Sequence, residues 1–260
     1  MAGQSLRGPA RGVPRTSTRL VPLLVWAVLL VLVPVALVTG APGSVRSKLL
    51  PHGSLAHLSA QPAGSGARLA LLAEAHAELA AMRDTEYQHD TDVDAAKGEF
   101  YYDCSGFLDY ALGRAAPAAL RALPVTASAG RPLAQDFEHT LRAGRAGPWR
   151  SVATPADLRP GDVVAWLATP DSRTRDTGHV VIVLDPPVRN PDRAGEWLVK
   201  VADSTVSPHA DDSRGTEADG LGTGTIGLAV DGADHAVGFY WRGGVSKVAK
   251  TTEVALGDLS

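Results

Sequence analysis

The 260-residue chain has little cysteine: Cys104 is its single thiol. One thiol excludes an internal disulfide, and it excludes zinc or iron–sulfur sites that need several cysteine ligands. Aromatic residues are also scarce, at 5%, whereas hydrophobic residues make up 45% and charged residues 20%. This is the composition of an ordinary globular protein, so the bulk of the chain is neither disordered nor fibrous.

Acidic residues are absent from residues 1–48, which hold six basic ones. The rest of the chain holds 28 acidic and 19 basic residues, a net charge of −9. Nucleic acid is therefore excluded as an expected partner, because phosphate binding needs a basic surface.

The N-terminal part has the layout of an export segment. A basic region at residues 1–19 precedes 19 uncharged residues at 20–38 that are rich in Leu and Val. A basic flank followed by an apolar run is typical of a signal peptide or a transmembrane anchor, and 19 helical residues nearly span a bilayer. We predict a membrane-export helix at residues 20–39, cleaved or retained. The domain that follows is then extracytoplasmic, secreted or anchored to the membrane.

Residues 40–66 are rich in Pro, Gly, Ser and Ala, which predicts a flexible linker before one domain at 67–260. Apolar spacing predicts helices at 67–84, 104–114 and 132–143, with an irregular or hairpin stretch at 87–102. Strands are predicted at 163–167, 179–185, 197–203, 225–230 and 236–241. Helices followed by strands indicate an α+β fold.

Cys104 follows Asp103, a residue type that caps helix N-termini. The thiol is then expected in the first turn of a helix, where the partial positive charge of the helix end favours a thiolate. The sequence thus predicts a nucleophile with a lowered pKa. The alternative is a small buried hydrophobic residue, the usual role of free cysteine.

His179 opens an apolar strand and is the candidate base, although a histidine there also fits a simple capping or surface role. A symmetric antiparallel hairpin of 179–185 with 197–203 sets His179 opposite Asp203, with Cβ atoms about 5 Å apart. Asp203 would then hold the imidazole in the useful tautomer. The alternative for Asp203 is a turn residue at a strand end.

Three motifs together resemble one protein family. They are Asp-Cys-Ser-Gly-Phe at 103–107, Arg-Pro-Gly-Asp-Val-Val at 159–164 and Gly-His-Val-Val-Ile-Val at 178–183. In this order, behind an export segment, they resemble the NlpC/P60 family of papain-like cysteine peptidases, many of which cut bacterial cell-wall peptides.

The resemblance implies a papain-like core in which the nucleophile helix packs on a small antiparallel sheet. It implies Cys104 as nucleophile, His179 as base and Asp203 as the residue that orients the base. It also implies that Tyr87 lies near the oxyanion site and that Asp103 and Ser105 touch the substrate. Tyr87 alone matches the Tyr-x-Trp-Gly-Gly segment found in many members.

Two acidic segments are candidates for other sites. Residues 90–94 resemble the start of a calcium loop, but Ala95 and Tyr101 stand where an EF-hand needs Gly and Glu. Residues 209–212, His-Ala-Asp-Asp, fit either a ligand cluster or a rival catalytic histidine. His209 is disfavoured as the catalytic partner because its surroundings predict a loop without a strand. The sequence predicts no metal site and no cofactor.

The sequence therefore favours an exported thiol amidase or endopeptidase acting on cell-wall peptides or a related extracytoplasmic substrate. The alternatives are a non-catalytic binding module with a papain-like groove, and a thiol acyltransferase or lipid hydrolase on the same fold.

Overall fold

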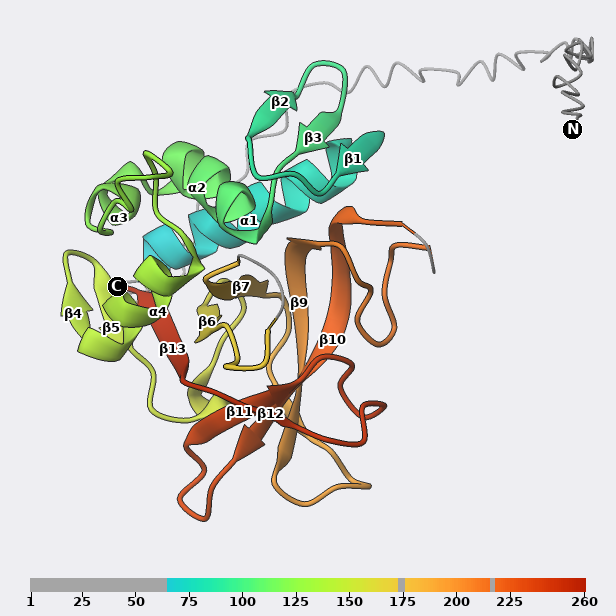
Figure 1. The fold of residues 1–260 in the computed structure, drawn as a ribbon. Coiled ribbons are helices and arrows are strands. Elements are labelled where there is room, and N and C mark those ends of the chain that lie inside the picture. The colour runs from blue at the N-terminus through green and yellow to red at the C-terminus, as the bar shows by residue number, and fades with distance from the viewer. Residues whose placement is uncertain (1–64, 173–175, 216–217) are drawn as a thin grey trace, which may run out of the picture. The chain divides into compact units, whose positions relative to one another are not determined.

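The computed structural model describes residues 65–172, 176–215 and 218–260 (Figure 1). Contacts divide the chain into Met1–Ser54 and Leu55–Ser260, and every described element belongs to the second unit. The predicted basic region, export helix and nearly all of the predicted linker lie outside the described residues. Within the described ranges no helix has the length and hydropathy needed to cross a membrane.

The helices lie mainly in the first half of the domain, as predicted. The helices are α1 (Ser65–Ala81), α2 (Cys104–Ala115), α3 (Pro117–Arg121) and α4 (Ala134–Ala143), with a 3-10 turn at Pro155–Asp157. The three predicted helices are confirmed within a few residues at each end. The short α3, which has proline in its first turn, was not predicted.

The strands form two sheets. The small sheet contains β1 (Asp84–Glu86), β2 (Asp92–Asp94) and β3 (Glu99–Tyr101). The large sheet contains β4 (Arg145–Ala146), β5 (Trp149–Ser151), β6 (Val163–Leu167), β7 (Gly178–Val183), β8 (Val188–Arg189), β9 (Glu196–Thr205), β10 (Gly220–Val230), β11 (Ala236–Tyr240), β12 (Lys250–Thr251) and β13 (Val254–Leu259). The α+β class is confirmed, but the large sheet has ten strands and is not the small sheet expected.

The order of the large sheet is β12-β11-β10-β9-β7-β6-β13-β5-β4, and β8 pairs with β9. All of its pairs are antiparallel. The C-terminal strand β13 was not predicted, yet it lies inside the sheet between β6 and β5. Its Gly257 and Asp258 weaken the apolar pattern that marks a strand.

The predicted hairpin register is wrong. The prediction pairs Ile182 with Lys200, whereas the structure pairs Ile182 with Ala202, a shift of two residues. The shift arises beyond β7, where β8 forms its own short pairing with β9 and makes the hairpin asymmetric. A shift of two keeps every side chain on its face of the sheet. His179 and Asp203 therefore stay on one face, as diagonal neighbours.

The sheet has a hydrophobic core on each face. α1, α2 and α4 cover one face (Figure 1), where Phe107 and Leu108 of α2 pack with Val180, Ile182 and Ala202. On the other face, strand residues such as Trp166, Val181 and Phe239 pack together and form the core. Strand β7 contributes to both cores, so its first residues are held rigidly beside the N-terminus of α2.

Candidate active site

The turn that carries Cys104 is capped as predicted. The Asp103 carboxylate accepts hydrogen bonds from the Gly106 N–H at 2.7 Å and from the Ser105 hydroxyl at 2.9 Å. This cap begins α2 at Cys104. The Cys104 N–H lies in the first turn of the helix, where backbone donors have no intrahelical acceptor.

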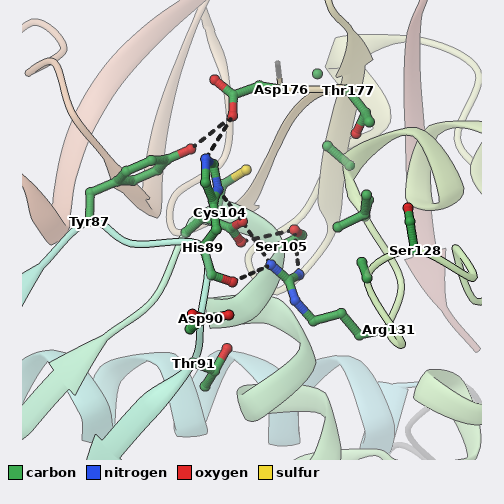
Figure 2. A pocket seen from close by; sticks show the side chains of 15 residues that line it. Tyr87, His89, Asp90, Thr91, Cys104, Ser105, Ser128, Arg131, Asp176 and Thr177 are labelled. Carbon is green, nitrogen blue, oxygen red and sulfur yellow. Dashed lines mark hydrogen bonds and ion pairs between the residues drawn. The ribbon is translucent and has the colours of Figure 1, made fainter. Parts of the chain in front are cut away.

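Arg131 connects this turn to the preceding loop, and sequence reasoning did not find it. Its guanidinium donates to Asp103 Oδ2 at 2.7 Å, to Ser105 Oγ at 2.7 Å and to the His89 carbonyl oxygen at 3.1 Å (Figure 2). Asp103 and Ser105 line the pocket beside the thiol, but these bonds already engage their polar atoms. Their role in the structure is to fix the helix turn.

Cys104 is buried, with 4% of the residue exposed. Burial, followed by the charge of Asp103, raises the pKa of Cys104 well above its usual value. The backbone N–H of Val180 lies near the sulfur and lowers this pKa, in the opposite direction. The predicted lowering of the pKa is therefore wrong: desolvation and nearby carboxylates outweigh the partial charge of the helix end.

His179 and Asp203 form the buried pair that was predicted. His179 Nε2 lies 2.6 Å from Asp203 Oδ2. Gly178 precedes His179, and a Cβ there would lie 1.9 Å from the Trp166 carbonyl oxygen, so the close pairing of β6 and β7 requires glycine. Because Nε2 is used by Asp203, Nδ1 is the nitrogen left for proton exchange.

One hydrogen bond ties the two halves of the site together. The Ser204 hydroxyl, next to Asp203, donates to the carbonyl oxygen of Tyr102 at 2.6 Å, close in sequence to Cys104. The structure records no hydrogen bond between the Cys104 sulfur and the His179 ring. The sulfur instead lies near the backbone N–H of Val180, the residue after His179.

His209, the rival partner of the sequence analysis, is buried and bound to the same carboxylate. Its Nε2 lies 2.8 Å from Asp203 Oδ2, and its Nδ1 lies 2.8 Å from the Trp241 carbonyl oxygen. Arg214 donates to Asp203 Oδ1 at 2.9 Å and to both carboxylate oxygens of Asp212. The expectation that no ordered element holds His209 is wrong, because the isolated bridge of Ala210 with Thr225 fixes its loop to β10.

His179, Asp203 and His209 also have the composition of a metal site, with their ligand atoms within 4.8 Å of one another. The ligand atoms of a tetrahedral zinc ion lie about 3.3 Å apart, given bonds of about 2.0 Å. Both imidazole nitrogens lie closer than that to one oxygen. Together with the Arg214 cation on the other oxygen, this favours shared protons over a shared metal ion.

A pocket of about 510 Å³ opens at Cys104 and includes Tyr87, His89, Arg131 and Asp176 (Figure 2). The Tyr87 hydroxyl lies 3.5 Å from Asp176. Burial, followed by the nearby acidic groups Cys104 and Asp176, raises the pKa of Tyr87, so its hydroxyl stays a donor. The predicted position of Tyr87 near the thiol is consistent with this pocket.

His89 is a second histidine near the thiol that sequence reasoning missed. Its Nδ1 lies 3.2 Å from Asp103 and its Nε2 lies 3.8 Å from Asp176, while 68% of its side chain is exposed. No pattern in the sequence distinguishes it from a surface histidine. It is a second candidate base, and it lines the Cys104 pocket, which His179 does not.

A second pocket of about 330 Å³ lies on the His179 side and shares Tyr87, Asp176 and Gly178 with the first. Its lining includes Trp166, which stacks on Phe239 with ring centroids 4.6 Å apart, and Trp241. The two pockets therefore flank the site and differ in their lining: the first has charged side chains and the second has aromatic ones.

Comparison with known proteins finds no matching family model, no matching curated protein and no matching solved structure.

Proposed function

We propose that this chain is an exported thiol hydrolase, an amidase or endopeptidase, with Cys104 as nucleophile, His179 as base and Asp203 as the residue that orients the base. One observation carries the proposal: the buried His179–Asp203 bond lies next to Val180, whose backbone N–H lies near the Cys104 sulfur. Hydrogen bonds between catalytic groups are often long before substrate binds, so the missing Cys104–His179 bond is compatible with this role.

The thiol starts the reaction protonated, because burial raises its pKa. The sulfur attacks the carbonyl carbon of an amide while its proton moves to His179 Nδ1. The new oxyanion is held by the Cys104 N–H and the Tyr87 hydroxyl. His179 then gives the proton to the leaving amine as the C–N bond breaks. Water, deprotonated by the same nitrogen, hydrolyses the thioester and restores the thiol.

The substrate class follows from the resemblance to NlpC/P60 peptidases and from the predicted export. Cell-wall peptides combine free charged groups with amide bonds. The pocket at Cys104 offers Arg131, His89 and Asp176 to such groups. We propose bacterial cell-wall peptides as the substrate and the extracytoplasmic space as the location.

The test is mass spectrometry of cell-wall peptides after incubation with the full-length chain in detergent. We expect cleavage at one amide bond and a transient acyl adduct on Cys104, the only cysteine. Cys104→Ser and His179→Gln should lose cleavage, whereas the exposed control His235→Gln should retain it. Loss of cleavage in His89→Gln, with His179→Gln active, would assign the base to His89. Cleavage by Cys104→Ser would reject the proposal.

A non-catalytic binding module is the second candidate, and the raised pKa of the buried thiol favours it. Such a module would bind wall peptides without cleaving them. Calorimetry with the same peptides would then give equal affinities for the wild-type chain and Cys104→Ser, and no adduct would form on Cys104.

A further inference from the structure

We propose that His209 and Arg214 are positioning residues of this site: they balance the charge of Asp203, so that Asp203 orients His179 without drawing a second proton onto it. The inference rests on the proposed function and extends the site beyond the three residues expected from the sequence.

Hydrogen-bond partners define the charge of His209. The Trp241 carbonyl oxygen can only accept, so His209 Nδ1 carries a proton. Although burial opposes ionisation, Asp203 accepts from the Arg214 guanidinium and its pKa lies well below its usual range, so its Oδ2 also accepts. His209 Nε2 therefore carries a proton as well. With both nitrogens protonated, His209 is a buried imidazolium.

The buried charges of this cluster are balanced without His179. Asp203 and Asp212 are negative, and His209 and Arg214 are positive. Arg214 bridges the two carboxylates, and the Asp212 carboxylate also accepts from the His209 backbone N–H at 2.6 Å. A proton added to His179 would create an excess positive charge in a buried setting, which is costly.

The charged groups around His209 come from each neighbouring segment. β9 supplies Asp203, β7 supplies His179, and the loop of His209 itself supplies Asp212 and Arg214. The segment after β11 contributes the Trp241 ring, whose centroid lies 4.4 Å from that of His209.

Strand β10 is shaped to receive this loop. A Cβ on Gly222 would lie 2.7 Å from the Arg214 side chain, and a Cβ on Gly224 would lie 2.6 Å from His209 Cβ. The two glycines lie on one face of the strand, and Gly222 pairs with Asp203. Their missing side chains leave the space that His209 and Arg214 occupy.

The first test is ¹⁵N NMR of the histidine rings in the full-length chain. We expect both His209 nitrogens to carry a proton at neutral pH, as in imidazolium. A neutral His209 with one bare nitrogen would overturn the proposal and would favour a metal site instead. This measurement needs no variant and no turnover.

The second test follows the ultraviolet absorbance of the Cys104 thiolate against pH, with Cys104→Ser as the blank. His209→Gln keeps an N–H donor for Asp203 but removes the positive charge. His179, which shares the oxygen, then accepts the thiol proton more readily, and we expect the thiolate to form about one pH unit lower.

The control His235→Gln changes an exposed histidine and should follow the wild-type curve. An unchanged or higher midpoint in His209→Gln would overturn the proposal. The proposed function has its own test: it is rejected if Cys104→Ser still cleaves wall peptides.

Discussion

The Ser204 hydroxyl donates to the Tyr102 carbonyl oxygen at 2.6 Å and joins two segments that lie 102 residues apart in sequence. Tyr102 comes just before Asp103, the cap of helix α2, and Ser204 comes just after Asp203. This bond therefore sets the distance between the thiol turn and strand β9.

Ser204→Ala leaves the buried Tyr102 carbonyl without this partner. We expect the free energy of unfolding to fall by about 1–2 kcal/mol in urea titrations, the usual cost of a buried unsatisfied group. Cleavage of wall peptides should fall further than stability explains. Ser151→Ala, at an exposed serine of β5, is the control, and equal losses in both variants would contradict the role given to Ser204.

Arg131→Gln removes the cation paired with Asp103. We expect a loss of about 2 kcal/mol in the free energy of unfolding. The unbalanced Asp103 carboxylate should also move the thiolate titration of Cys104 to higher pH, because Asp103 already raises the pKa of this thiol. Arg121→Gln, at an exposed position, should change neither quantity. A lower midpoint in Arg131→Gln would refute the argument.

Gly178→Ala places a methyl group 1.9 Å from the Trp166 carbonyl oxygen. Strands β6 and β7 must separate to admit it, and we expect the free energy of unfolding to fall by about 3 kcal/mol. Gly232→Ala is the matched control, because a Cβ there meets no atom within 4 Å. Similar midpoints of urea unfolding for both variants would show that the close strand pairing does not require glycine.

Glu78 predicts a pH dependence of stability. Burial raises the pKa of Glu78 to about 8, and Tyr102 donates to its carboxyl group at 2.7 Å. The folded pKa lies above the unfolded value of 4.5, so the stability that the neutral acid contributes is full below pH 4.5 and is lost as pH rises through 8. The amide in Glu78→Gln cannot ionise, so this variant should avoid a pH-dependent loss in the free energy of unfolding on the order of 4 kcal/mol.

Urea unfolding of wild type and Glu78→Gln across this range measures the effect. The two stabilities should diverge with rising pH. Glu253→Gln, at an exposed residue, should run parallel to the wild type. Asp109 and Asp162, whose pKa values are raised to about 7, add to the same trend in all three proteins. A constant difference between wild type and Glu78→Gln would contradict the assignment to Glu78.

Local signals predicted much of the fold and part of the site. Asp103 as cap, the helix that begins at Cys104 and the strand predicted from His179 follow from short motifs. The structure confirms all three, and the strand begins one residue earlier, at Gly178. The contact of His179 with Asp203 also formed, although the register was wrong, because a shift of two residues preserves the face.

Features that depend on distant partners were missed. The pKa of Cys104 depends on burial that no local pattern reveals. Strand β10 begins at Gly220, five residues earlier than predicted, because alternating glycines lower strand propensity. The same glycines were the available signal for His209, since glycine in a strand marks the close approach of another segment.

The space above Gly222 and Gly224 is filled by side chains from another part of the chain, and this has an evolutionary consequence. A lineage that loses His209 or Arg214 leaves a cavity over β10, and one that gains a larger residue at either glycine expels the loop. Substitutions at the two glycines and in the loop are therefore coupled, and we expect related sequences to keep or lose the whole charged cluster together.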